Sequence, residues 1–374
     1  MSIWISVHQR HKMKKMKYID EYRNKDIVLS LANEIKKAST KPVKLMEVCG
    51  GHTMSIQKFG IPYLLPETVK LISGPGCPVC VTSRNFIDKA VAYSRRDDVI
   101  ITTYGDLIRV PGSTSSLDQE KAKGADVRIV YSILDALMVA KKNRRKKIVF
   151  LGIGFETTAP SSAAGLVKAQ MAGLPNFFLF SAHKVMPPAM ETLIDEGVEI
   201  DGYIGPGHVS TITGDGIYQN IPKKFGLGVV ISGFEPVDLM QSILMLVRQI
   251  ENNDPKVEIQ YTRLVKPEGN IKAQQMLDEV FEYGDDWWRG LGVLKNSGLK
   301  IREKYAMHNS EKMIEVEVEP TIEPKGCICG EILRGVKSPK DCKLFATVCN
   351  PSNPVGACMV SNEGSCAAQY LYNR

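Results

Sequence analysis

Nine cysteines are spread unevenly along the 374-residue chain. Three of them lie upstream in glycine-rich segments, Cys49 in residues 49–53 and the pair Cys77 and Cys80 in residues 74–80. The remaining six fall within the last 48 residues, at positions Cys327, Cys329, Cys342, Cys349, Cys358 and Cys366. In a reducing compartment, clustered thiols are more often metal ligands or redox groups than structural disulfides. We therefore expect a cytoplasmic protein with a cluster-binding tail and a separate upstream thiol site.

The tail offers more thiols than one cluster needs. A cubane iron–sulfur cluster takes four cysteine ligands, whereas zinc usually takes two close Cys-x₂₋₄-Cys pairs. The only close pair in the tail is separated by a single residue, so the spacing favours a [4Fe-4S] cluster over zinc. We expect the ligands to be Cys329, Cys342, Cys349 and Cys366. Cys327 and Cys358 are then spare, although spacing alone does not decide between Cys327 and Cys329.

The upstream thiols have two different settings. Cys77 and Cys80 form a Cys-x-x-Cys pair after an apolar run, which predicts a redox dithiol, with two ligands of a metal site as the alternative. Cys49 directly follows an apolar run and precedes two glycines, which let the backbone approach a ligand closely. As a thiolate, Cys49 could bind iron or act as a nucleophile. His52 could reach the same ion, although a loop histidine is usually only hydrogen-bonded.

Residues 152–160 resemble a phosphate loop only superficially. They lack the Lys-Ser/Thr of a P-loop and the third glycine of a dinucleotide loop. Glu156, Thr157 and Thr158 are instead expected to line a cleft as proton or hydrogen-bond partners. A capped helix start, with a threonine as N-cap and Pro160 in the first turn, is a compatible local role. His183 and His208 stand at other strand ends, and each alone is expected to be structural.

The order of apolar and helical segments predicts an α/β fold. Short apolar runs that suit buried parallel strands are 43–48, 69–72, 99–102, 127–131, 148–151, 177–180, 202–204 and 229–231. Helical stretches at 27–37, 132–142 and 237–250 alternate with them. This alternation predicts two open, mostly parallel sheets that face a cleft, with a C-terminal iron–sulfur domain. Ligands bind beyond the carboxyl ends of such strands, where most of the unusual loops fall.

The expected divisions follow composition. Residues 1–25 form a flexible basic extension, with Met16 as an expected start. Two α/β domains cover 26–146 and 147–254, divided at the basic run 141–147, because four strands precede that run and four follow it. A helical and cluster-binding domain covers 255–374, with a helix at 271–283 and an exposed strand at 314–318.

Charge and hydropathy exclude some classes of partner. The net charge of +7 is modest, and the basic run is expected to be a helix C-terminus rather than a nucleic-acid patch. The sequence contains no run of 18 apolar residues, so it predicts no membrane span. We therefore expect neither nucleic acid nor a membrane as a partner.

Taken together, these motifs resemble those of the HypD family of hydrogenase maturation (expression/formation) proteins. The matching segments are 49–53, 74–80, 154–160, 329–330, 354–361 and 363–366. They occur in order, and the resemblance spans residues 26–374. Only the N-terminal extension departs from it.

The resemblance implies a scaffold on which an iron ion acquires two cyanides and one carbon monoxide, the Fe(CN)2CO unit of [NiFe] hydrogenase. It implies a complex with the small chaperone HypC and with HypE, which supplies the cyanide. It also implies one [4Fe-4S] cluster in the tail. Cys49 would be the protein ligand of this transiently held iron, shared with a cysteine of HypC, and His52 would lie close by.

The resemblance further assigns Cys77 and Cys80 as the redox pair between the iron and the cluster. Glu156, Thr157 and Thr158 would line the same cleft. One alternative is an autonomous iron–sulfur thiol–disulfide oxidoreductase, which needs neither Cys49 nor a partner. A zinc-stapled binding protein without redox chemistry is the other alternative.

Overall fold

The computed structural model describes residues 16, 17 and 19–373. Of the expected N-terminal extension, residues 1–15 and residue 18 therefore lie outside the described residues. Its later part is packed onto the fold. A 3-10 turn, η1 (Asp20–Arg23), precedes helix α1 (Lys25–Ala38), and Arg23 donates to Glu235 at 2.8 Å.

Two parallel sheets confirm the predicted α/β class. The first has the order β2-β1-β7-β8-β9, formed by Val69–Ser73, Val43–Glu47, Gly202–Pro206, Gly228–Ser232 and Val257–Ile259. The second has the order β4-β3-β5-β6, formed by Val127–Ile129, Val99–Thr103, Lys147–Gly154 and Phe177–His183. All eight predicted strands are present, and every pairing within these two sheets is parallel.

The expected division of the strands at the basic run is wrong. β1 and β2 pair in one sheet with β7 and β8, while β3 and β4 pair in the other with β5 and β6. A boundary between residues 146 and 147 therefore cuts through the second sheet and does not separate the two. The glycine–proline loops after β2 and β7 follow strands of the same sheet, because β2 and β7 pair with β1 on its two sides.

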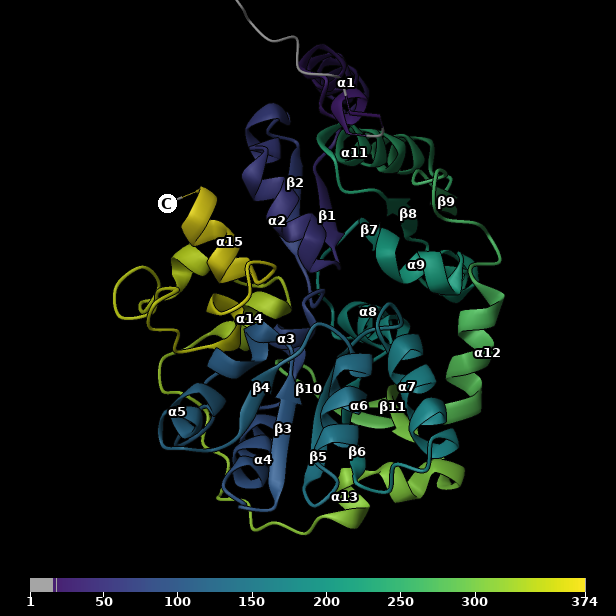
Figure 1. The fold of residues 1–374 in the computed structure, drawn as a ribbon. Helices are drawn as coiled ribbons and strands as arrows, with labels where there is room; N and C mark the ends of the chain where they lie inside the picture. The colour runs from purple at the N-terminus through teal and green to yellow at the C-terminus, as the bar shows by residue number, and fades with distance from the viewer. Residues whose placement is uncertain (1–15, 18, 374) are drawn as a thin grey trace, which may run out of the picture.

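Helices cover both sheets and fill the space between them (Figure 1). They are α2 (Gly50–Lys58), α3 (Pro78–Val81), α4 (Arg84–Ser94), α5 (Leu117–Ala122), α6 (Ile133–Lys142), α7 (Ala159–Met171), α8 (Met186–Asp195), α9 (Gly207–Thr213), α10 (Asn220–Phe225) and α11 (Pro236–Asn252). Helices α1 and α11 pack together over the first sheet, and α4, α6 and α7 pack on the second. The short helix α3 lies between the sheets in Figure 1.

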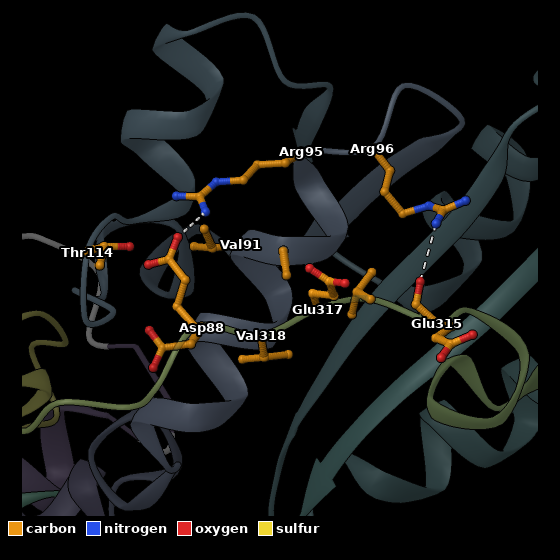
Figure 2. A pocket seen from close by; sticks show the side chains of 11 residues that line it. Asp88, Val91, Arg95, Arg96, Thr114, Glu315, Glu317 and Val318 are labelled. Carbon is orange, nitrogen blue, oxygen red and sulfur yellow. Dashed lines mark hydrogen bonds and ion pairs between the residues drawn. The ribbon is translucent and has the colours of Figure 1, made fainter.

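The C-terminal third adds helices and a hairpin. The helices are α12 (Ile271–Val280), α13 (Ser310–Met313), α14 (Cys329–Leu333) and α15 (Ser365–Tyr372), and the antiparallel hairpin is β10 (Phe281–Trp288) with β11 (Gly292–Ile301). The helix expected to reach residue 283 thus ends at 280. The prediction of a strand at 314–318 is wrong, since this segment pairs with no strand among the described residues. Figure 2 shows it beside α4, where Arg96 donates to the Glu315 carbonyl at 3.2 Å.

No helix in the described part of the chain is long and apolar enough to cross a bilayer. One continuous buried cluster runs from β1 through α3 and β5 to the C-terminal segment. Cys77, Cys80, Cys329, Cys349, Cys358 and Cys366 all belong to it. The core of the protein therefore brings the upstream and tail cysteines into the same packed region.

Candidate thiol and metal site

Cys49 stands where β1 ends and α2 begins. It is the N-cap residue of α2; the residue as a whole keeps some solvent exposure, while its sulfur is closely surrounded by protein atoms. The Gly50 amide donates to the Gly76 carbonyl at 3.0 Å, which ties this turn to the loop that carries Cys77. A Cβ at Gly76 would collide with the backbone of Val48 and Cys49. Residue 76 must therefore be glycine for the two thiol motifs to lie against each other.

Substitution at Gly76 should disturb this contact. We expect Gly76→Ala to lower the free energy of unfolding by about 1–3 kcal/mol, because the added methyl group meets backbone rather than a movable side chain. Gly216→Ala is the matched control, since its Cβ would meet nothing within 4 Å. Urea denaturation of both variants measures the difference. Equal stability of the two would contradict the close approach.

Cys77 and Cys80 form a disulfide across helix α3, with their Cα atoms 5.2 Å apart. The Cys80 amide also points at the Cys77 sulfur, 3.3 Å away. Both residues are nearly inaccessible to solvent, at 4% and 0% exposure. A pair this deeply buried can exchange with other thiols of the same core, but it is closed to an external protein substrate.

Two carboxyl groups flank Cys49, and the sequence reading had missed both. Glu47 is buried at the end of β1, where it accepts from the Cys49 amide at 3.1 Å and from the Thr53 hydroxyl at 2.5 Å. Burial raises the pKa of Glu47 to about 8. Glu363, from the loop before α15, lies against Gly50. The only sequence signal for Glu47 was a charged residue inside a buried strand.

The Cys49 thiol is held in its protonated form. Its pKa rises to about 12, first because of burial and then because of the negative charges of Glu363 and Glu47. Amide groups of the α2 N-terminus oppose this rise without overcoming it. A coordinating metal cation deprotonates a thiol outright. The free thiol is therefore unreactive, and it would become a thiolate when a metal ion arrives.

His52 is fully buried and faces the neighbouring strand β8. Its Nε2 lies 3.2 Å from the Ser232 carbonyl, and its ring packs on Phe234 with centroids 4.6 Å apart. Its Nδ1 has no hydrogen-bond partner in the structure. Burial lowers the pKa of His52 to about 4, so the ring is neutral. The His208 ring also stacks on Phe234, with the two ring centroids 3.9 Å apart.

Glu156 lies after β5 and is buried. Its Oε1 accepts from the Met186 amide at the start of α8 at 3.0 Å, while Oε2 has no partner. Burial raises the pKa of Glu156 to about 7. The buried Tyr218 is within electrostatic reach of both Glu156 and Cys49, since the charge of each raises its pKa.

The two threonines beside Glu156 have different surroundings. Thr158 is the N-cap of α7 by position, but its hydroxyl donates to the Ile153 carbonyl at 3.4 Å rather than capping the helix. Pro160 stands in the first turn, as predicted. Thr157 is exposed. Thr158 thus occupies the expected N-cap position without capping the helix through its side chain, and no described contact joins either threonine to a thiol.

His183 is structural, as expected, because both of its ring nitrogens are partnered. Nε2 lies 3.1 Å from the Ser162 hydroxyl, and Nδ1 lies 3.0 Å from the Ser181 hydroxyl. Burial lowers the pKa of His183 to about 3 from an ordinary value of 6.5. The unfolded chain therefore takes up a proton that the folded chain refuses. The contribution of His183 to the free energy of unfolding is therefore complete above pH 6.5 and is lost as the pH falls toward 3.

An acid titration tests this assignment. We expect His183 alone to reduce the free energy of unfolding by about 2 kcal/mol between pH 6.5 and pH 5. In His183→Gln, which keeps a hydrogen-bonding side chain, the decline over this range should be smaller by that amount. Urea denaturation at both pH values gives the comparison. An equal decline in the two proteins would mean that His183 is protonated in the folded state.

The tail cysteines divide into a pair and a group of four. Cys329 and Cys358 form a disulfide, with Cα atoms 6.4 Å apart. The choice of Cys329 over Cys327 as a cluster ligand is therefore not supported, because the Cys329 sulfur is bonded to Cys358. The free thiols are Cys327, Cys342, Cys349 and Cys366. Sequence spacing does not decide between Cys327 and Cys329, because it carries no information on where each sulfur points.

The four free thiols gather around one small cavity. It is lined by all six tail cysteines together with Ile332, Leu344, Phe345, Gly356 and Met359. Burial raises the pKa of Cys366, and the charges of Cys349, Cys327 and Cys342 raise it further. The four sulfurs are thus within electrostatic reach of one another. Within residues 16, 17 and 19–373, no three metal-ligating side chains are gathered tightly enough to hold a single ion.

The two disulfides belong to elements that pack together. Helix α3, with Cys77 and Cys80, packs against α14 and against η7 (Ala357–Met359), which carry Cys329 and Cys358. Arg289, between β10 and β11, donates to the Cys80 carbonyl at 3.0 Å and to the Thr82 carbonyl at 2.9 Å, which ties the end of α3 to the hairpin. The fold therefore orders the sulfur groups as the four thiols, the tail disulfide, the α3 disulfide and Cys49.

Comparisons with known proteins agree with these motifs. Residues 26–373 match the family HypD, described as the Hydrogenase formation hypA family. The chain is 47% identical over 370 residues to the hydrogenase maturation factor HypD2 of Bradyrhizobium diazoefficiens, covering 96% of this chain and 97% of that protein. It is 49% identical over 350 residues to a putative hydrogenase expression/formation protein of Methanocaldococcus jannaschii, covering 93% and 96%. It is 46% identical to the hydrogenase maturation factor HypD of Azotobacter vinelandii, covering 96% and 97%.

Proposed function

This chain belongs to the HypD family of hydrogenase maturation factors, and from that premise we propose that it is the scaffold on which the Fe(CN)2CO unit of [NiFe] hydrogenase is assembled. The partners in this proposal are a HypC-type chaperone and a HypE-type cyanide donor. The observation that carries it is the setting of Cys49. A single free thiol stands at a strand end, beside a buried disulfide and two carboxyl groups.

In this proposal, Cys49 receives the iron as its substrate. The raised pKa keeps the empty thiol neutral, and the arriving cation turns it into a thiolate ligand. Soft thiolate sulfur suits iron that carries cyanide and carbon monoxide. Glu47 holds the backbone of this turn in place by accepting from the Cys49 amide. The remaining iron ligand from protein would come from a cysteine of the HypC-type partner.

The tail fits a [4Fe-4S] cluster. Four free thiols and an apolar wall surround one point, which is the ligand number and the environment that such a cluster requires. The residues that would hold it are Cys327, Cys342, Cys349 and Cys366. When bound, the cluster would supply single electrons at low potential. Zinc sites are usually built from two pairs of ligands that are close in sequence, and these four thiols are too widely spaced along the chain to form such pairs.

The two disulfides provide a place for thiol exchange. A reduced Cys329 and Cys358 pair can transfer two electrons and two protons to the Cys77–Cys80 disulfide through a mixed disulfide, because their elements pack together. The burial of Cys77 and Cys80 supports an internal role for this pair. It argues against the alternative of an autonomous oxidoreductase that acts on other proteins.

Complementation tests the proposed function. A host that lacks its own HypD gene but keeps its other maturation factors should regain [NiFe] hydrogenase activity when it produces this chain. The same chain in a host that also lacks the HypC-type chaperone should restore nothing. Restored activity without that chaperone would favour a function independent of the proposed complex.

A further inference from the structure

A cavity of about 450 Å³ lies beside Glu156, on the side of α8 where the C-terminal hairpin packs. Its walls come from the start of α8, the turn after α9, helix α12 and both strands of the hairpin β10–β11. The lining side chains include Val185, Pro187, Ile217, Leu277, Phe281 and Leu299. None of the functions assigned above uses this cavity.

The Glu156 carboxyl group beside the cavity has one oxygen without a hydrogen-bond partner among the described residues. Glu156 is 4% exposed and lines the cavity. Its Oε1 is satisfied by the Met186 amide, but Oε2 accepts no hydrogen bond. Leaving a buried polar group without a hydrogen-bond partner is destabilising, and more so for a charged group. A ligand that donates a hydrogen bond to Oε2 would recover this free energy.

The charges of the side chains that line the cavity determine which ligand charge it favours. No lysine, arginine or histidine lines the cavity, whereas two carboxyl groups do, Glu156 and Asp278. The amide nitrogen of Gln274 is already used, since it donates to the Ile212 and Glu268 carbonyls at 2.8 Å each. Phosphate or carboxylate ligands would find like charge and no cationic partner. A positively charged donor would find two acceptors.

The rest of the lining combines apolar side chains of valine, proline, isoleucine, leucine and phenylalanine with the uncharged polar residues Thr213, Gln274, Tyr283 and Asn296. Ligand sites of this size are typically apolar with a few fixed polar groups that orient the ligand. We propose that this cavity binds a small organic ammonium compound, whose cationic head donates to Glu156 and whose apolar body packs against Leu277, Phe281 and Leu299. The inference goes beyond the scaffold function and does not depend on it.

The cavity has a direct relation to the thiol site. Tyr218 is buried behind Glu156 and is within electrostatic reach of both Glu156 and Cys49. An ammonium group bound at Glu156 would therefore add a positive charge within electrostatic reach of Tyr218.

Binding of 2-phenylethylammonium tests the proposal, with 3-phenylpropionate as the anion of similar shape. Isothermal titration of the full chain should give saturable binding of the ammonium compound and none of the anion. Glu156→Gln keeps the shape of the side chain but removes its charge, and should weaken binding at least tenfold. Leu277→Trp should abolish binding by filling the cavity. Met171→Trp is the control, since Met171 is 82% exposed and does not line the cavity.

The pH dependence gives a second readout. Because burial raises the pKa of Glu156 to about 7, affinity for the ammonium compound should fall between pH 8 and pH 6 as the carboxyl group takes up a proton. The other titratable groups facing it are Asp278 of α12, Tyr283 of β10 and Tyr218. In Leu277→Trp no pH-dependent binding should remain.

Three results would overturn the proposal. They are equal binding of ammonium and anion, binding that survives Leu277→Trp, and no saturable binding of the ammonium compound at about 10 mM, a concentration far above ordinary ligand affinities. If Glu156→Gln does not fold, Leu277→Trp and the anion still decide. Complementation by the wild-type chain is unaffected by any of these outcomes, so failure here is distinct from failure of the scaffold function.

Discussion

Cys49→Ala should abolish hydrogenase maturation while leaving the rest of the molecule intact. Removing even an indirect partner of a metal ligand typically costs 10–100-fold, so loss of the ligand itself should reduce maturation by more than about 100-fold. The residue keeps some solvent exposure and its thiol donates no described hydrogen bond, so stability should change little. Hydrogenase activity in the complemented host measures the effect.

Two controls accompany this variant. The purified Cys49→Ala protein should keep the visible absorbance and the iron and sulfide content of the wild type, because the tail thiols are unchanged. Ser55→Ala, on the same helix α2 but with no assigned chemistry, should mature hydrogenase normally. Maturation at the wild-type level by Cys49→Ala would remove this residue from the function, whatever the state of the cluster.

The second large effect concerns the neighbouring cysteines 327 and 329. We expect Cys327→Ala to lose the cluster, with iron and acid-labile sulfide falling from about four each per chain toward zero. Cys329→Ala should keep both, because the Cys329 sulfur is bonded to Cys358 and the free thiols are elsewhere. The two substitutions are chemically identical and only two residues apart, so each serves as the control for the other.

Chemical iron and sulfide determination on anaerobically purified protein gives the comparison. The disulfide assignment makes one further demand, which is that Cys358→Ala behaves like Cys329→Ala. The opposite pattern, with the cluster kept by Cys327→Ala and lost from Cys329→Ala, would restore the assignment expected from the sequence and contradict the structure.

Local segments of the fold were predictable, but the pairing of the strands was not. Apolar runs of five or so residues located all eight expected strands, because buried parallel strands have little polar alternation. Which strands pair depends on how the chain crosses between sheets, and no periodicity records it. The chain enters the first sheet, leaves it after β2 to build the second, and returns at β7. A division by chain order could not anticipate that return.

Exposed segments were the other source of error. Alternating glutamate and valine at 314–318 has the pattern of an edge strand. In the described structure this segment pairs with no strand, and Arg96, just after α4, donates to the Glu315 carbonyl instead. The hairpin at 281–301 was missed, because its first residues continue the helical pattern of α12. In both places tertiary contacts decide the conformation, and local sequence does not.

For the site, residue types revealed the sulfur chemistry but not its arrangement. Cys49 and the Cys77–Cys80 pair could be singled out because glycine-rich turns after apolar runs are unusual. The structure adds that Gly76 lies against Cys49 and that Glu47 and Glu363 flank it. The partition of the tail into one disulfide and four thiols depends on contacts between segments about 30 residues apart, and spacing carries no such information.

Infrared spectroscopy of the chain, purified anaerobically together with its HypC-type and HypE-type partners, tests the central claim most directly. The account predicts stretching bands of iron-bound cyanide and carbon monoxide in the wild-type complex. The same bands should be missing from a complex that contains Cys49→Ala but still assembles. Bands of equal intensity in both complexes would show that the diatomic ligands are mounted on an iron that Cys49 does not hold.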